Sequence, residues 1–410
     1  MARLMLSLPL YRLAVCRWCF LLVCIGWGFS AGAQSIINGK VVSSASNEVV
    51  PKASVFLNNA TFGTATNDDG TFTLSGVKPG QYDLIVSTLG YEEYTQKVQV
   101  GQGPITVNIA LTPKVMMMRE VVITSNADWK KNFEQFKKDF IGVTDNAKYC
   151  KVENPRVLSL SYIRKTQTLE ASSDEFLVVN NDALGYKVKF LLRDFSSNNI
   201  TRTINYSGRV LFEELPGTAA QKQKWKTRRD EAYYGSAQHF YRSLYKNRLS
   251  QEGFVIYDFS RTLDPNRPPE ALIQKKLKAF RMVNRDSTIY WLGKENMPKW
   301  YQEHLTKPPL TAYAVLRKPP QEGLFVLTFP NYLYVVYTKK HETEDFKDLY
   351  RPLDMENFET SVITLLAPIV VFDMNGTVVA DSPLYEGTWS KAKLANLLPV
   401  DYEPSDGAGN

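Results

Sequence analysis

The sequence predicts a mainly β protein, in which an N-terminal seven-stranded β-sandwich precedes a larger antiparallel β-rich domain with a helical insert. Short runs suited to strands fill positions 36–111, and turn residues separate them at the spacing of small sandwiches. Similar runs return after position 156 and are interrupted by helical periodicity over 218–249. With 410 residues, 44% of them hydrophobic, the chain can bury more than one core, so we expect two domains.

Turn chemistry predicts two hairpins in the sandwich. Residues 67–70 form the first turn, because asparagine and aspartate side chains bond back to the backbone and Gly70 accepts a positive φ. The Pro79-Gly80 pair begins the second, and apolar and polar residues alternate over 82–87. The other sandwich strands are predicted at 36–42, 53–57, 64–66, 71–74, 95–100 and 105–111.

Several spaced motifs in this region occur together, at residues 39–41, 51–55, 63–74, 79–82 and 89–91. They resemble the carboxypeptidase regulatory-like domain, and residues 120–124 resemble the segment that follows such domains. The resemblance implies a transthyretin-like sandwich, which often opens TonB-dependent receptors and other exported proteins of Bacteroidota-type bacteria. In metallocarboxypeptidases the module is an accessory without catalytic residues, so the resemblance implies no peptidase activity.

Residues 1–33 are typical of a signal peptide. They contain three arginines and no acid, then an apolar run over 20–29 and an Ala-x-Ala site that ends at Ala33. We expect cleavage between Ala33 and Gln34, and an exported protein of the periplasm or outer membrane. Lipid attachment at Cys24 stays open as an alternative.

The net charge and the number of cysteines bear on the expected partners and on disulfide bonds. Without the three arginines of residues 1–33, 46 of the 49 basic residues stand against 42 acids, a mild net charge of +4. We therefore expect no nucleic-acid partner. Only Cys150 lies beyond the predicted signal, so no internal disulfide is expected, and Cys150 fits a small buried apolar residue.

Beyond the sandwich, the aromatic residues of 128–140 recur at helical spacing and predict a helix at the domain junction. We divide the chain into a signal peptide (1–33), the sandwich (34–113), a linker and helix (114–140), a β-rich domain (141–403) and a polar tail (404–410). Strands of the β-rich domain are predicted at 157–163, 176–180, 186–195, 201–206, 209–214, 279–283, 287–292, 324–328, 333–338 and 362–372.

The helical insert begins at Thr218, which can form a capping box with Gln221, and Gly235-Ser236 divides it into two helices. Basic residues outnumber acids in this insert. That excess fits either a solvated face or an anionic partner such as an acidic glycan. Residues 234–244, with the 186–190 and 206–215 runs, resemble a region of uncharacterised function that follows the sandwich in other envelope proteins.

Candidate catalytic residues do not form a complete set. The histidines are His239, His304 and His341, and residues 341–344 match only the first half of a zinc carboxypeptidase motif. No G-x-S-x-G elbow, phosphate-binding loop or dinucleotide fingerprint occurs. We therefore expect no catalytic, metal or cofactor site.

The sequence thus favours a non-catalytic envelope protein that binds or scaffolds a glycan, a peptide or an outer-membrane partner. Tyr91, Tyr94 and Arg242 are the candidate partner surface, since the two tyrosines would lie beside the strand edges of the sandwich and Arg242 belongs to the 234–244 run. The alternatives are an envelope hydrolase that acts on glycan or peptide, and a small outer-membrane barrel.

Overall fold

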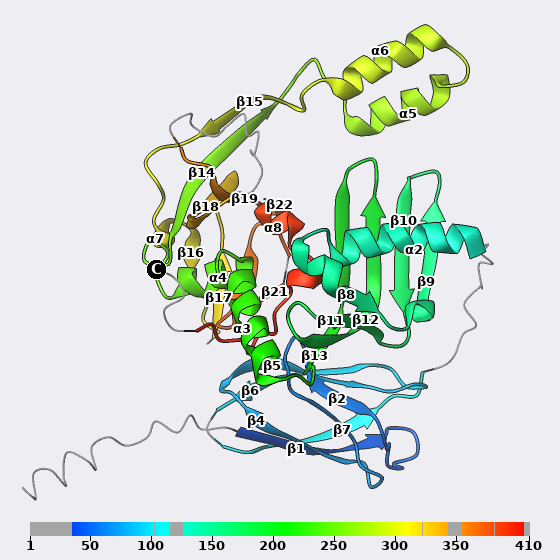
Figure 1. The fold of residues 1–410 in the computed structure, drawn as a ribbon, viewed down its shortest axis with the longest axis vertical. Helices are drawn as coiled ribbons and strands as arrows, with labels where there is room; N and C mark the ends of the chain where they lie inside the picture. The colour runs from blue at the N-terminus through cyan, green and yellow to red at the C-terminus, as the bar shows by residue number, and fades with distance from the viewer. Residues whose placement is uncertain are drawn as a thin grey trace, which may run out of the picture.

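Three β-rich parts meet at the centre of the molecule, and a helical hairpin over 270–296 stands away from them (Figure 1). The computed structural model describes residues 35–101, 103–114, 126–321, 323–342, 355–380 and 382–405. The mainly β fold class predicted from the sequence is confirmed. The predicted cleavage site at Ala33 and Gln34 lies outside the described residues.

The first part is the predicted β-sandwich. Its strands are β1 (Ser35–Ser43), β2 (Ser54–Leu57), β3 (Gly63–Ala65), β4 (Thr71–Val77), β5 (Gly80–Ser87), β6 (Tyr94–Val100) and β7 (Ile105–Leu111). One sheet has the order β4-β1-β7 and the other β3-β2-β5-β6. Alternate residues of both sheets, among them Ile37, Phe72 and Val86, form the buried core between them.

The two predicted turns are present, but they are corners between sheets. Gly70 has φ +76°, and its N–H donates to the Asn67 carbonyl at 2.9 Å. After this turn β4 pairs with β1, and after the Pro79-Gly80 turn β5 pairs with β2 and β6. The hairpin predictions were therefore wrong, because turn chemistry sets the reversal of the chain but not the sheet that the next strand joins.

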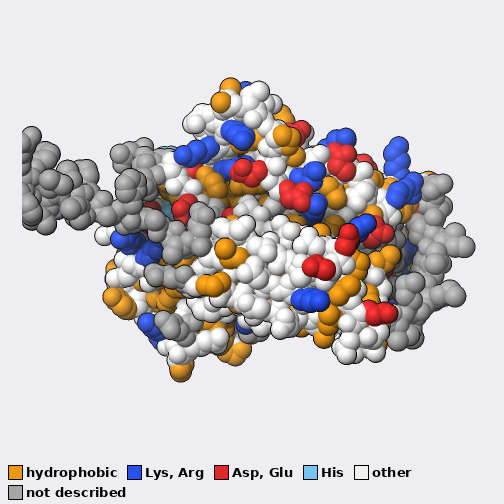
Figure 2. Space-filling model, turned by 90° about the horizontal axis from the view of Figure 1, so that it is seen from below, with side chains coloured by type: hydrophobic (Ala, Val, Ile, Leu, Met, Phe, Trp, Pro, Cys, Tyr) orange, Lys and Arg blue, Asp and Glu red, His pale blue; other side chains and the backbone are white. Residues whose placement is uncertain are grey.

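The outer face of the β4-β1-β7 sheet is largely uncharged when the molecule is seen from below (Figure 2). Its outward side chains include Asn38 and Thr73, which share a hydrogen bond of 3.0 Å, and Asn108. A neutral polar face exerts little long-range attraction on charged partners.

The second part is an antiparallel sheet that α2 (Asn126–Ile141) covers on one face (Figure 1). Phe136 and Phe140 of α2 are fully buried and meet Phe195 and Phe190 edge to face, with ring centroids 4.8 and 5.0 Å apart. The predicted helix is confirmed, and it packs on this sheet. The sheet order is β8-β11-β12-β10-β9, with β13 along β12. The elements are η1 (Asp145–Tyr149), β8 (Cys150–Val152), η2 (Pro155–Val157), β9 (Leu158–Ile163), β10 (Thr168–Ser173), β11 (Leu177–Asn181), β12 (Tyr186–Asn198) and β13 (Thr203–Glu214).

The third part contains two sheets, with the strand orders β15-β14-β18-β19-β22 and β16-β17-β20-β21. The elements that follow β13 along the chain are α3 (Ala219–Tyr233), α4 (Ala237–Tyr245), β14 (Phe254–Leu263), α5 (Glu270–Phe280), α6 (Arg285–Asn296), β15 (Trp300–Leu305), α7 (Ala312–Val315), β16 (Leu316–Arg317), β17 (Leu324–Leu327), β18 (Tyr332–His341), β19 (Phe358–Thr364), β20 (Val370–Asp373), β21 (Val378–Ala380), β22 (Leu384–Gly387), α8 (Thr388–Lys391) and η3 (Leu394–Asn396).

The predicted caps of the helical insert are confirmed. Thr218 accepts a hydrogen bond from the Gln221 N–H at 3.3 Å, and the reciprocal contact completes a capping box. Ser236 caps α4 by accepting from the His239 N–H at 3.1 Å. Gly235 has φ +86°, which a glycine adopts at little cost, so the chain can turn between α3 and α4 at this residue.

The strands predicted at 279–283 and 287–292 are wrong, since these residues belong to α5, α6 and the turn between them. Asn284 caps α6 by accepting from the Ser287 N–H at 2.8 Å. Short apolar runs do not distinguish strands from helices by period alone. The cap, which the strand assignment overlooked, decides between them.

The C-terminal segment 394–405 joins the three parts. Its Leu394 and Leu398 pack in the core of the second part, and its Val400 packs in the core of the sandwich. The Val400 N–H donates to the Asn59 carbonyl at 2.7 Å. Through these contacts one short segment holds elements that lie more than 300 positions apart in the sequence.

Asp230 of α3 fastens this segment. Its buried carboxylate accepts from the Tyr402 hydroxyl at 2.7 Å and from the Ser405 N–H and hydroxyl at 3.0 and 2.8 Å. Hydrogen bonds to a charged acceptor each contribute about 1.5–3 kcal/mol. Asp230 therefore holds residues 402–405 against α3.

We expect Asp230→Ala to lower the free energy of unfolding by about 2–4 kcal/mol. The loss is smaller than the sum of three charge-assisted hydrogen bonds, because Ser405 is only half-buried and water can reach its donors. Urea denaturation of the purified chain would measure the change. The exposed neighbour Glu231 provides a matched control, and Glu231→Ala should alter stability by less than about 0.5 kcal/mol. Equal effects from the two substitutions would contradict this role of Asp230.

Candidate functional site

A cavity of about 420 Å³ lies where the three parts meet. Its volume falls in the range of small-molecule binding sites. The sandwich, the β12–β13 pair and the β20–β21 turn each supply part of the wall. The lining residues are Asn58, Asn59, Gln81, Tyr82, Asp83, Lys97, Phe190, Tyr206, Ser207, Gly208, Arg209, Val210, Asp373, Asn375, Thr377, Val378, Val379, Ser382, Leu397 and Val400.

The sandwich side of the cavity is hydrogen-bonded to the edge of β13. The Asn59 N–H donates to the Val210 carbonyl at 2.8 Å, and the Asn58 side-chain oxygen accepts from the Val210 N–H at 2.9 Å. Ala60 continues this contact as a short parallel bridge to Leu211. The turn after β2 thus extends the second sheet, which gives the cavity a fixed wall.

The β20–β21 turn forms the opposite wall and is held by its own hydrogen bonds. Asp373 accepts from the N–H groups of Asn375 and Thr377 at 2.9 and 3.0 Å. The Asn375 amide donates to the Gln81 carbonyl of β5 at 3.1 Å, which ties the third part to the sandwich. At Gly376 a Cβ would lie 2.5 Å from the Gln238 carbonyl oxygen, so only glycine allows α4 to approach this closely.

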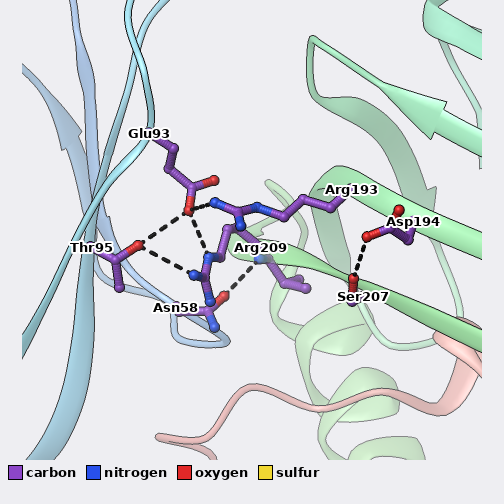
Figure 3. Close-up of polar contacts among 8 residues, drawn as sticks. Asn58, Glu93, Thr95, Arg193, Asp194, Ser207 and Arg209 are labelled. Atoms are coloured by element: carbon purple, nitrogen blue, oxygen red, sulfur yellow. Dashed lines mark hydrogen bonds and ion pairs between the residues drawn. The ribbon is translucent and has the colours of Figure 1, made fainter. Parts of the chain in front are cut away.

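A charged cluster clamps the sandwich to β12 and β13 beside the cavity (Figure 3). Oε1 of Glu93 accepts from Arg209 at 2.9 Å and from Arg193 at 2.5 Å. Arg209 also donates to the Thr95 hydroxyl at 3.2 Å. Oε2 of Glu93 is buried and has no hydrogen-bond partner among the described residues. The cluster joins parts that are distant in sequence and places the side chain of Arg209 at the cavity wall.

The walls of the cavity combine a few charges with many neutral hydrogen-bonding groups. Lys97 and Arg209 supply positive charge, and Asp83 and Asp373 supply negative charge. Amides, hydroxyls and backbone groups make up most of the other polar lining, and three aromatic rings lie among them. This arrangement can bind a polar, roughly neutral ligand through hydrogen bonds and ring contacts.

Asp373 has an unusual protonation equilibrium. Burial raises its pKa to about 6, although hydrogen bonds from Thr377 and Asn375 act in the opposite direction. The side chain is 5% exposed. A carboxyl group with this pKa changes charge within the wall of the cavity near neutral pH.

The three residues predicted as a partner surface lie on different elements. Tyr91 and Tyr94 are half-buried against the sandwich core at the start of β6. Arg242 lies in α4, where its guanidinium donates to the carbonyls of Asn375, Val400 and Tyr402 at 2.9, 2.6 and 2.9 Å. These carbonyls occupy the guanidinium of Arg242.

The structure also shows the environments of His239, Cys150 and His341, three other residues named from the sequence. His239 is 3% exposed, and burial lowers its pKa to about 4 even though Glu252 lies 3.3 Å away. Burial raises the pKa of Cys150 to about 12, which disfavours the reactive thiolate. His341 contacts Glu356 at 3.1 Å, and Glu344 lies outside the described residues.

Among the described residues, no cluster of three or more His, Cys, Asp or Glu side chains is arranged to hold a metal ion. None of the helices there combines the length and apolar character needed to cross a membrane.

Sequence reasoning missed the cavity residues. Asn58 and Asn375 read as ordinary turn residues, and Arg209 as one charge in a strand. The nearest available signal was the 206–215 run, which contains several of the lining residues but has no known chemistry. Their common location depends on the packing of three parts and cannot be derived from local spacing.

Comparison with known proteins addresses the first part of the chain. Residues 37–123 match the family of the CarboxypepD_reg-like domain. The match supports the predicted domain and covers about a fifth of the chain. Among curated proteins, none matches the sequence significantly.

Several solved structures are similar to a small part of this chain. The pilus 2b backbone protein of group B streptococcus is 21% identical, with a TM-score of 0.17, over 19% of this chain and 40% of that one. Catechol 1,2-dioxygenase from an Acinetobacter species is 12% identical, with a TM-score of 0.18, over 23% of this chain and 59% of that one. This chain therefore covers less than two thirds of either protein, and similarity at this level supports no functional argument.

Replacing Asp373 by asparagine tests its protonation. Since the folded state raises the pKa from 3.8 to about 6, protonation stabilises the fold, and this contribution is lost as pH rises through that interval. Asparagine keeps the accepting oxygen but never ionises. We expect Asp373→Asn to gain on the order of 3 kcal/mol relative to the unchanged chain between pH 4 and pH 8. Urea denaturation across this range would measure the difference, and a pH-independent difference would contradict the argument.

Glu93 offers a test of the clamp. We expect Glu93→Gln to lower the free energy of unfolding by about 1–3 kcal/mol, because Arg193 and Arg209 lose their shared carboxylate. A double-mutant cycle with Arg209→Met should show coupling of about 1 kcal/mol or more. The exposed neighbour Glu92 is the matched control, and additive effects of Glu93→Gln and Arg209→Met would show that the pair is not coupled.

Proposed function

We propose that this chain is a non-catalytic binding protein of the bacterial envelope, and that the cavity between its three parts binds a short glycan. Export and location in the periplasm or outer membrane rest on the signal-like residues 1–33. The ligand class rests on the cavity. Its size suits one or two sugar units, and its walls carry many neutral hydrogen-bonding groups.

One observation carries this proposal: three parts of the fold form the cavity wall, and hydrogen bonds fix each of them. The asparagine turn at 58–59, the β13 edge and the β20–β21 turn are each held by hydrogen bonds. Their polar groups are therefore largely in place before a ligand arrives, which lowers the entropic cost of binding. A sugar matches this lining because it presents hydroxyl groups at its edges and C–H groups at its faces.

Aromatic rings and charges refine the ligand class. Tyr206 lines the cavity and is 37% exposed, so its ring can contact the C–H face of a sugar, whereas Tyr82 and Phe190 are buried in the wall. Lys97 can pair with one acidic group, as in an acidic glycan. A short peptide remains the second ligand class, since its amides use the same hydrogen-bonding groups.

Ser207→Phe tests the cavity directly. Ser207 lines the cavity and is exposed, so a phenyl group there should fill the space without disturbing a core. We expect at least a tenfold loss of affinity for any envelope oligosaccharide that binds the purified chain in calorimetric titration. Ser159 is an exposed serine on β9 of the same sheet, and Ser159→Phe should bind as the unchanged chain does.

Three results would count against the proposal. The cavity would be excluded if Ser207→Phe bound the glycan normally, and the glycan class would be excluded if only peptides bound. Release of cleaved products from a bound glycan would contradict a non-catalytic role and favour the hydrolase alternative.

A further inference from the structure

The helical hairpin formed by α5 and α6 stands apart from the three parts, and β14 and β15 connect it to them (Figure 1). Its internal core is small. Ile273 and Leu277 are its buried residues in α5, and α6 contributes no buried residue. A helix pair with so little internal burial has apolar surface left for another contact.

The turn at the tip of this hairpin exposes apolar side chains. Met282 is 93% exposed and Val283 is 82% exposed, the highest values among the large hydrophobic residues of the described chain. Hydrogen bonds from the N–H groups of Val283 and Asn284 to the Phe280 carbonyl hold the turn. Met282 and Val283 are therefore kept in solvent by a formed turn that Asn284 also caps.

Basic residues surround this apolar tip. Residues 275–285 contain Lys275, Lys276, Lys278, Arg281 and Arg285 and no acid. The hairpin's acids lie mainly at its base, where Glu270 pairs with Arg267 at 2.7 Å and Glu295 accepts from Gln274 at 2.8 Å. Asp286 is the acid nearest to the tip in the sequence. Positive charge is thus concentrated where the apolar side chains are exposed.

More apolar surface continues from the tip along α6. Ile289 is 56% exposed, Tyr290 is 58% exposed and Leu292 is 42% exposed. Lys294 lies over the ring of Tyr290, 5.8 Å from its centroid. Aliphatic groups, an amphipathic aromatic ring and long basic side chains are the combination that membrane interfaces favour.

From these observations we propose that the α5–α6 tip binds the surface of an anionic phospholipid membrane, with Met282 and Val283 inserted among the lipids. The basic residues would lie at the level of the lipid phosphates. The combination favours a membrane over a soluble polyanion, because a polyanion neutralises the charges but leaves the apolar tip in water. This site is separate from the cavity, so the inference goes beyond the proposed function.

Sedimentation with lipid vesicles tests the proposal on the purified chain without residues 1–33. We expect binding to vesicles of phosphatidylethanolamine and phosphatidylglycerol, weakening as salt rises, and little binding to phosphatidylcholine alone. Lys275→Glu with Lys278→Glu should weaken binding by more than about tenfold, since each basic residue near the surface contributes about fivefold. Met282→Ser with Val283→Ser should also weaken it by about tenfold or more.

Matched controls lie elsewhere on the chain. Lys222 and Lys224 of α3 are exposed, and reversing both charges changes the net charge as much as the hairpin variant does. Leu89 and Leu366 are 78% and 67% exposed, and they control for the loss of apolar surface. Both control pairs, changed to glutamate and serine respectively, should bind vesicles within about twofold of the unchanged chain, as expected for sites away from the contact.

Each other outcome overturns the proposal. Failure to bind the anionic vesicles would remove the membrane contact, and an equal loss in the α3 control would show a general charge effect. In another outcome, dextran sulfate displaces the chain from vesicles while the Met282→Ser, Val283→Ser variant still binds vesicles and dextran sulfate as the unchanged chain does. That result would show that the tip is a polyanion site. Circular dichroism of every variant would confirm that folding is unchanged.

Discussion

The path of residues 394–405 between the three β-rich parts is the constraint on which the rest of the structure depends. Arg242 and Asp230 hold this segment from one side, and the sandwich holds it from the other through Asn59 and Thr61. Backbone carbonyls buried at this junction need donors, and a guanidinium satisfies several of them at once. Arg242 alone therefore supplies hydrogen-bond donors to three backbone carbonyls.

The cavity follows from this way of joining the parts. Hydrogen bonds join the sandwich to the β13 edge and to the β20–β21 turn. These contacts lie at the periphery of the three elements, so a space is left between them. The space is lined by polar groups because turns and strand ends surround it. A ligand that contacts all three walls would favour the joined arrangement over separated parts, so binding would also stabilise the fold.

Local signals in the sequence predicted much of the fold. Thr218 and Ser236 mark the helix starts that the structure shows, and the aromatic spacing of 128–140 predicts α2. Pairing was harder, because the turn at 67–70 looks the same whether the next strand joins the same sheet or the opposite one. The 201–206 and 209–214 runs are a single strand, β13, which crosses Ser207 and Gly208 without a break.

The contacts that a basic residue makes within the chain, more than the number of basic residues, decide whether it is available to bind another molecule. The excess of basic residues around α3 and α4 is partly structural, since Arg229 pairs with Glu214 and lies over Tyr186, and Arg228 lies over Tyr149. Arg242 is likewise occupied. On the α5–α6 hairpin the same residue types lie beside exposed apolar side chains. A membrane surface can contact both kinds of side chain. Its anionic phosphates attract the basic residues, and its acyl chains remove the apolar side chains from water.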